Sequence, residues 1–255
     1  MIVREHDMGL VMIEQHEHGK LAGDFAKQLS SAVLAPDEPY ASDLITAIYE
    51  HDRGWIYLDK KPLWNEETGK PYTFVDYPLE PKLAAYQQGL DEVEDMSPYA
   101  SLICSMHFAS FTQQAHETAW KRFLRHEENR QDRLRRELGL EAEHPALLRH
   151  FRLLQLCDDL SLYVCLNEPG ADKEAEHPWF RDGFAHTSFL NPAEDTPVTA
   201  YWREREFVEV RPFLFSDPFE VSVTYRKLAK ERVRLMGGEA AYKSSSPRTG
   251  LLRIQ

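Results

Sequence analysis

The chain has 255 residues, of which 42 are acidic and 30 basic, giving a formal net charge of −12 at pH 7. With 42% apolar and 11% aromatic residues, the composition is typical of a globular protein with one large core and a smaller appendage. The acidic balance argues against nucleic acid as a bulk ligand, because binding a polyanion requires clustered cationic surface.

The sequence contains no feature of export or of membrane insertion. No stretch approaches the ~18 consecutive apolar residues of a membrane span, and the N-terminal sequence lacks the zones of a signal peptide. Its three cysteines lie in apolar, helix-like segments, where a thiol behaves as a small hydrophobe (Cys104, Cys157 and Cys165). We therefore expect a cytoplasmic protein without a disulfide framework.

The N-terminal part of the chain predicts a short strand pair within residues 1–13, followed by an amphipathic helix over residues 15–31. The apolar stripe of this helix repeats at helical spacing (Leu21, Ala22, Phe25 and Leu29). His18 falls on the same stripe, so the sequence predicts that this imidazole faces the core.

A second helix is predicted from Ser42, a good N-cap residue, through Asp52. Its apolar rows include both His51 and Asp52, so the two side chains should point inward. Gly54 then ends the helix. Residues 55–81 contain several prolines and aromatic residues and predict a long structured loop, of the kind that forms pocket walls.

Three further helices are predicted before residue 167. The first begins near Ser97 and Pro98 and passes through His107 and Gln114. The second covers the charged segment 121–138, with a solvated face. The third covers residues 145–166, where Asp158 occupies the apolar row and Asp159 the more polar face.

After Pro169 the pattern changes to alternation, which predicts strands at 198–202, 207–215 and 219–226. The predicted fold is mostly α, a helical bundle with a small C-terminal antiparallel β-sheet. We expect a helical metal-binding domain at residues 1–167, a small β appendage on the same core at 168–236, and a polar tail at 237–255.

Polar side chains on the inward faces of three predicted helices carry the functional hypothesis (His18, His51, Asp52 and Asp158). A buried polar group requires a partner to offset its desolvation. Separate hydrogen-bonded core residues would explain any one of them. Together, two imidazoles and two carboxylates form a set that a divalent transition metal ion accepts, and Mn, Fe, Zn, Ni and Co all suit it.

The order H…HD…D resembles the HD-domain superfamily of metal-dependent phosphohydrolases. The doublet ends an apolar helix (AIYEHDRGW), the last aspartate lies in LLQLCDDLSL, and HGKLAGDFA is similar to the first ligand helix of the family. The resemblance covers roughly residues 12–167 and implies that His18, His51, Asp52 and Asp158 are metal ligands. Arg53 follows the doublet where most HD hydrolases have a small or apolar residue, which indicates a separate bacterial branch.

Further residues are candidates for chemistry beside the metal. His107 is either a satisfied core residue or a pocket residue, and Asp52 would both ligate the metal and orient a water. Arg53 and Lys60 are the cations nearest the doublet and would bind phosphate, although a surface role also explains them. Trp55 opens an aromatic-rich loop that would either line a pocket or simply pack.

Three functions follow from these residues. The first is hydrolysis of a small phosphate ester or nucleotide, with a metal-activated water as nucleophile. The second is an HD-type di-iron oxygenase, in which His107 and a bridging carboxylate complete a two-iron centre. The third is a non-catalytic metal- or ligand-binding module. The expected partner is a small phosphorylated molecule, with no nucleic acid and no membrane, and a homo-oligomer remains open.

Overall fold

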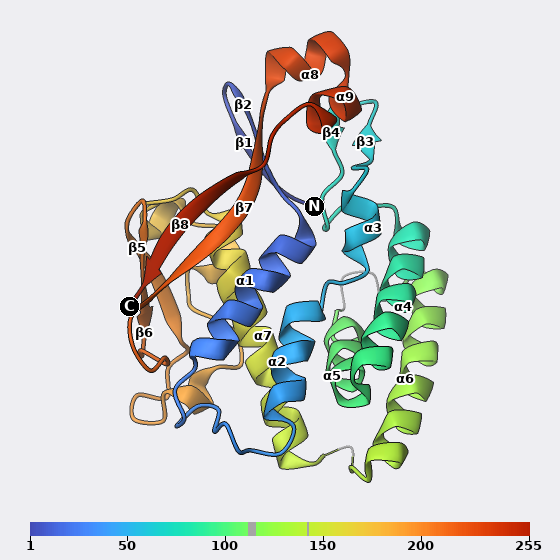
Figure 1. Cartoon of the computed structure of the whole chain (residues 1–255), viewed down its shortest axis with the longest axis vertical. Helices are drawn as coiled ribbons and strands as arrows, with labels where there is room; N and C mark the ends of the chain where they lie inside the picture. Colours follow the sequence, from blue (N-terminus) through green and yellow to red (C-terminus); the bar gives the residue numbers. More distant parts are fainter. Residues whose placement is uncertain (112–115, 142) are drawn as a thin grey trace.

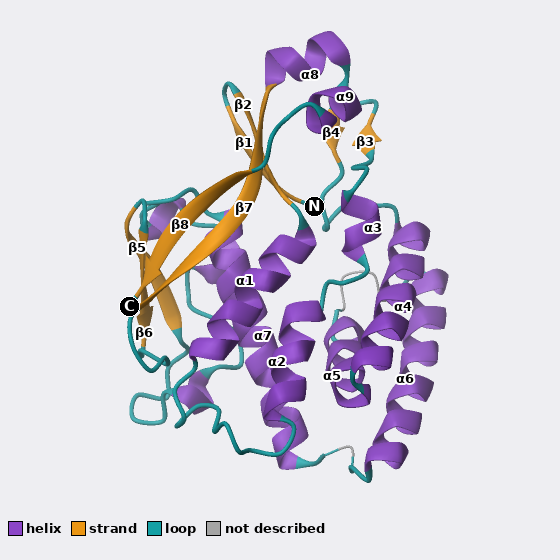
Figure 2. Cartoon of the chain, viewed as in Figure 1, coloured by secondary structure: helices purple, strands orange, loops and turns teal. Residues whose placement is uncertain are grey.

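The computed structural model describes residues 1–111, 116–141 and 143–255. A group of helices packs beside a curved sheet (Figures 1 and 2). The helices are α1 (Gln15–Gln28), α2 (Ala41–Glu50), α3 (Trp55–Asp59), α4 (Leu79–Met96), α5 (Pro98–Ala109), α6 (Thr118–Leu138), α7 (Pro145–Leu166), α8 (Lys230–Met236) and α9 (Gly238–Lys243), with short 3-10 helices η1 (Lys173–Ala175), η2 (Pro178–Phe180) and η3 (Ser188–Leu190). The strands are β1 (Ile2–His6), β2 (Gly9–Ile13), β3 (Trp64–Asn65), β4 (Lys70–Pro71), β5 (Thr199–Glu204), β6 (Phe207–Arg211), β7 (Phe219–Ala229) and β8 (Arg248–Ile254).

The main sheet has six strands in the order β1-β2-β7-β8-β6-β5. Neighbouring strands are antiparallel, except β6 and β8, which are parallel. The N-terminal hairpin joins this sheet because β2 pairs with the second half of β7, where Met12 opposes Arg226. The predicted fold, a mostly α bundle with a small C-terminal antiparallel sheet, is therefore wrong. The sheet is large, mixed, and built from both ends of the chain.

The helix α1 connects the sheet with the helical layer, since it packs against β7 on one side and against α2 and α7 on the other. Its predicted stripe is confirmed, because Leu21, Ala22 and Phe25 are fully buried. The ring of Phe25 lies 6.2 Å from those of Phe215 and Phe219 beside the sheet. Burying this stripe fixes the rotation of α1, and so the direction in which His18 points.

The helix α2 ends at Glu50, so the His51–Asp52 doublet lies in a turn between α2 and α3 and not within the predicted helix. This turn is pressed against α4. A Cβ atom on Gly54 would lie 2.2 Å from the carbonyl oxygen of Ala85, and one on Gly89 would lie 2.5 Å from the amide nitrogen of Gly54. The two backbones approach too closely for a side chain. The glycines thereby seat the doublet against α4.

The predicted loop at residues 55–81 contains α3 and the β3-β4 ribbon, and it runs into α4. This helix was not predicted, although Leu83, Tyr86 and Leu90 recur at helical spacing. The predicted start of α5 is confirmed, because Ser97 Oγ accepts a hydrogen bond from the amide of Ala100 at 3.1 Å. Gln114, predicted to continue that helix, lies outside the described residues. The predicted helices at 121–138 and 145–166 correspond to α6 and α7.

The C-terminal strands were predicted correctly, but the last segment was not. The predicted strands correspond to β5, β6 and β7, with Val221 and Val223 of β7 buried as the alternation requires. Residues 237–255, predicted as a polar tail, instead form α9 and β8, and β8 pairs with both β7 and β6. Among the described residues, we find no helix with the length and apolar character of a membrane span.

Candidate metal centre

His18 lies on the buried face of α1 and is oriented by α7. Its Nδ1 atom lies 2.6 Å from Ser161 Oγ, and this hydroxyl donates its one proton to the carbonyl oxygen of Asp158 at 2.8 Å. The hydroxyl oxygen must therefore accept a hydrogen bond from His18 Nδ1. In a neutral imidazole this leaves Nε2 as the atom that carries the lone pair.

A backbone carbonyl group orients His51 in the same way. Its Nδ1 atom lies 2.8 Å from the carbonyl oxygen of Ile48, which can only accept, so Nδ1 is the protonated nitrogen. Its Nε2 atom is buried and has no hydrogen-bond partner in the structure. When neutral, both histidines therefore present Nε2 with its lone pair to the interior, and their rings meet edge to face at 5.0 Å.

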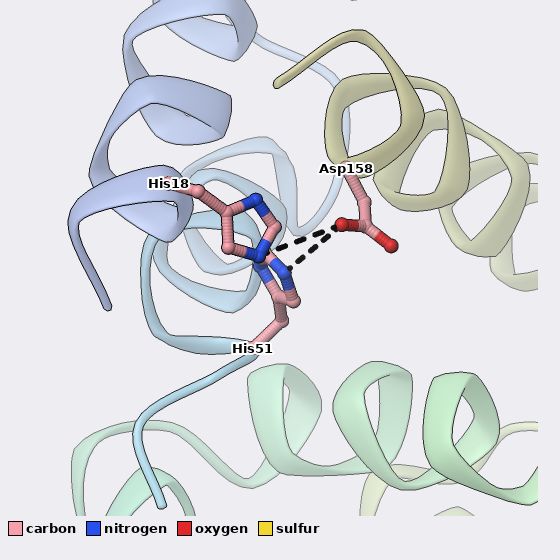
Figure 3. A group of neighbouring side chains, drawn as sticks. All are labelled: His18, His51 and Asp158. Atoms are coloured by element: carbon pink, nitrogen blue, oxygen red, sulfur yellow. Dashed lines mark ion pairs between the residues drawn. The ribbon is translucent and has the colours of Figure 1, made fainter. Parts of the chain in front are cut away.

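Asp158 of α7 faces both of these nitrogens (Figure 3). Its Oδ1 atom lies 3.8 Å from His18 Nε2 and 3.4 Å from His51 Nε2. One ligand atom from each of the three residues lies within 4.8 Å of the other two. Three segments of chain that are distant in sequence thus bring two imidazoles and a carboxylate to one buried point.

Asp52 completes the group from the turn after α2. Its Oδ2 atom lies 2.9 Å from His18 Nε2 and 3.8 Å from His51 Nε2. The same oxygen accepts a hydrogen bond of 2.9 Å from Gln15 Nε2, and the backbone amide of Gln15 donates to Asp59 Oδ2 at 2.7 Å. The structure therefore brings together all four predicted ligands, and that they bind an ion is what we propose below.

The charged side chains of the group stabilise one another, and this opposes the cost of removing each of them from water. Burial favours the neutral acids, but the charge of His51 outweighs it and lowers the pKa of both Asp52 and Asp158, with smaller contributions from the neighbouring histidines. Burial disfavours the charged form of His51, yet Asp52 and Asp158 raise the pKa of this imidazole to about 9. In the absence of a metal ion, the group therefore holds a proton among its acceptor atoms.

The donor set fits a divalent transition metal ion. Two imidazole lone pairs and two carboxylates converge, and the remote nitrogen of each ring is fixed by a hydrogen bond to Ser161 or to backbone, as is usual for histidines that bind metal. An ion would take the place of the shared proton and would satisfy the orphaned Nε2 atom of His51.

His107 of α5 lies against the second oxygen of Asp158. Its Nε2 atom is 3.4 Å from Asp158 Oδ2, and its buried Nδ1 atom has no hydrogen-bond partner in the structure. Burial lowers the pKa of this imidazole to about 4, so the ring is neutral near pH 7. The structure thus places His107 in the group, beside the ring of Phe111 at 4.8 Å.

A cavity of about 320 Å³ opens next to the group and gives it access to a ligand. Its lining contains polar groups from the cluster together with aromatic and aliphatic side chains (Gln15, His18, Asp52, Phe74, Val75, Lys82, Tyr86, His107, Ser110, Phe111, Trp120, Asp158, Asp159, Leu162 and Trp179). A concave site in which polar groups converge among apolar side chains is a common form of small-molecule site.

The other predicted residues lie elsewhere. Arg53 forms ion pairs with Glu50 at 2.9 Å and Glu92 at 2.6 Å, and Lys60 is exposed, with its ammonium 5.5 Å from the ring centroid of Tyr57. Trp55 is buried and packs against Tyr77 and Tyr86. None of these three predicted residues is among the residues that line the cavity.

Some residues of the site were not predicted from sequence. Gln15 lies three positions before His18 and Ser161 three after Asp158, so helical spacing alone would have placed each on the right face. Asp159 lines the cavity, where burial and the charge of Asp158 raise its pKa to about 8. Lys82 also lines the cavity, but a single lysine in a helix gives no signal of burial.

Comparison with known proteins identifies the family but no activity. No curated protein and no solved structure matches the chain. One family model matches residues 1–230, a range that includes all residues of the cluster, and its description is protein of unknown function (DUF3891). Because the match covers most of the chain, the protein belongs to the DUF3891 family.

Proposed function

We propose that this protein is a metal-dependent hydrolase that acts in the cytoplasm on a small phosphate ester or nucleotide. One observation carries the proposal: the Nε2 atoms of His18 and His51 lie beside two carboxylates next to a ligand-sized cavity. The order of these residues along the chain also resembles that of the HD phosphohydrolases.

Each residue has a defined task in this reaction. A divalent ion, when bound, polarises a phosphoryl oxygen and lowers the pKa of a coordinated water. His18, His51 and Asp158 would hold the ion, and Gln15 orients Asp52 toward it. Asp52 would orient the attacking water, and His107 at the cavity wall would stabilise charge on the transferred group.

The first test is elemental analysis of protein purified without chelators, followed by assays on a panel of phosphate monoesters and nucleotides. We expect at least one transition metal ion per chain, and hydrolysis of at least one compound of the panel. The variant His51→Ala should lose both metal and activity. His116→Ala, which removes an exposed imidazole, should retain both. A metal-loaded protein that hydrolyses no panel member would contradict the proposal.

One observation favours a second candidate, the di-iron oxygenase. The two oxygens of Asp158 face different histidines: Oδ1 faces His18 and His51, and Oδ2 faces His107 at 3.4 Å. A carboxylate with this orientation is suited to bridging two ions. Two iron atoms per chain, an iron-dependent visible spectrum and oxygen uptake would favour this candidate over hydrolysis.

If His51→Ala loses metal but still binds ligand, the site is a binding module.

A further inference from the structure

We propose that Lys82 binds the anionic group of the substrate inside the cavity, while apolar side chains at the cavity mouth hold an apolar or aromatic remainder. The inference rests on the proposed hydrolase and narrows its substrate to a small phosphate monoester with an apolar leaving group. Lys82 would act as a specificity residue, in place of the predicted cations Arg53 and Lys60.

The ammonium group of Lys82 belongs to a buried residue and has few partners that offset its desolvation. Lys82 lies in the first turn of α4, and its side chain lines the cavity although the residue is only 6% exposed. Its Nζ atom donates one long hydrogen bond, 3.4 Å, to the carbonyl oxygen of Phe74. Among the described residues, no carboxylate lies within ion-pair distance of this ammonium. Burial accordingly lowers its pKa, against a smaller opposing effect of Asp76.

A buried ammonium is normally paired, because its desolvation is costly. A ligand anion in the cavity would supply the missing partner of Lys82. A bound divalent ion would polarise one phosphoryl oxygen, but Asp52 and Asp158 balance its two positive charges and leave no net charge for the rest of the anion. Among the described residues that line the cavity, Lys82 is the only lysine or arginine. The net positive charge that attracts a phosphate dianion would therefore lie at Lys82.

Three large apolar side chains that line the cavity are exposed, which places them at its mouth. Val75, Phe111 and Trp179 are 47%, 37% and 45% exposed, and all three line the cavity although they come from separate segments of the chain. The ring of Trp179 also meets that of Phe74, with centroids 6.2 Å apart. Exposed apolar groups gathered around a cavity mark a binding site. At about 320 Å³, the cavity is at the small end of ligand pockets, which favours a compact substrate.

The test is calorimetric titration of metal-loaded protein with phenylphosphonate, whose P–C bond resists hydrolysis. We expect Lys82→Met to weaken binding by about tenfold or more and Lys82→Arg to restore most of it, with metal content unchanged in both. Lys121→Met, at an exposed position on α6, should bind like the wild type. Wild-type affinity in Lys82→Met, or no binding to wild type at millimolar phenylphosphonate, would overturn the inference.

A second variant tests the apolar mouth independently of Lys82. Trp179→Ala removes a half-exposed ring, so it should fold normally. We expect it to weaken phenylphosphonate binding about threefold or more and to leave methylphosphonate binding unchanged; equal affinity for phenylphosphonate would refute the apolar subsite. Failure of the proposed function looks different: phosphonate binding would depend on Lys82, yet no ester would be hydrolysed. Hydrolysis at the wild-type rate and KM in Lys82→Met would refute only the inference about Lys82.

Discussion

His18 Nε2 lies 2.9 Å from Asp52 Oδ2, although both atoms are acceptors when the imidazole is neutral. The hydrogen bond from His18 Nδ1 to Ser161 places the proton of the neutral ring on the opposite nitrogen. Two lone pairs cannot face each other at this distance in a buried site without a positive charge between or beside them. Either a proton or a metal ion must be present, and the predictions below distinguish these states.

Ser161 should control metal affinity without touching the metal. Because its hydroxyl fixes the tautomer and the ring orientation of His18, we expect Ser161→Ala to lower the affinity about 10-fold or more. Competition with a chelating dye measures this change. Ser101→Ala is the matched control, since Ser101 is equally buried. Its hydroxyl donates a hydrogen bond of 3.1 Å to the backbone carbonyl oxygen of Leu90. Equal affinity in the two variants would show that Ser161 does not position the ring.

The metal-free protein should lose stability as the pH rises from about 6.5 to 9. The pKa of His51 is raised to about 9 in the folded state, so its contribution is complete below the unfolded value of ~6.5 and is lost as the pH passes 9. The expected loss in the free energy of unfolding is on the order of 2–3 kcal/mol. Urea unfolding of chelator-treated protein at several pH values measures it.

Two controls isolate the contribution of His51. Asp159, whose pKa is raised to about 8, lowers stability in the same direction up to that pH, so wild type must be compared with His51→Asn. The variant should show the smaller slope. Bound metal replaces the proton on His51, so loaded protein should also show a smaller loss, which leaves only the contribution of Asp159. An identical pH dependence in wild type and His51→Asn would refute the assignment.

Sequence reasoning located the centre of this site because helix phase is a local property. The apolar stripes of α1 and α7 determine which way His18 and Asp158 point, and both stripes are visible in the sequence. The sheet could not be assembled in the same way, because the pairing of β2 with β7 joins residues more than 200 positions apart. Local periodicity marks strands but not their partners.

The cavity was harder to predict than the ligands. Lys82 is buried by the segment around Phe74, and this depends on how the loop before α4 folds, which leaves no periodic trace in the sequence. Arg53 and Lys60 are the cations nearest to the doublet along the chain. The turn containing the doublet instead directs Arg53 toward Glu50 and Glu92. Sequence distance was a poor guide here because neighbouring residues of this turn point their side chains in different directions.

Gly54 should be intolerant of any side chain. Its backbone dihedral angle φ is −57°, which any residue adopts, so Gly54→Ala tests packing alone. The new Cβ would meet the carbonyl oxygen of Ala85 at 2.2 Å and push the doublet away from α4. We expect a loss of about 1–3 kcal/mol in unfolding free energy, together with weaker metal binding. A Cβ atom on Gly250 would have its nearest neighbour at 3.4 Å, so Gly250→Ala should change neither the unfolding free energy nor metal binding.

Arg4 should stabilise the helix that carries Asp158. From β1, its Nη1 atom donates to the carbonyl oxygens of Val164, Cys165 and Asn167 at 3.3, 2.9 and 2.8 Å, which caps the C-terminal end of α7. Carbonyls at a helix end lack partners within the helix and carry partial negative charge, so a cation is favourable there.

We therefore expect Arg4→Met to lower the free energy of unfolding by about 2 kcal/mol, because it leaves these buried carbonyls unpaired. Arg4→Lys should recover only part of the loss, since an ammonium cannot reproduce the planar guanidinium. Arg203→Met, which removes a half-exposed arginine paired with Glu209, should change stability by less than about 1 kcal/mol. Equal urea midpoints for Arg4→Met and Arg203→Met would show that β1 does not hold α7, and with it Asp158, in place.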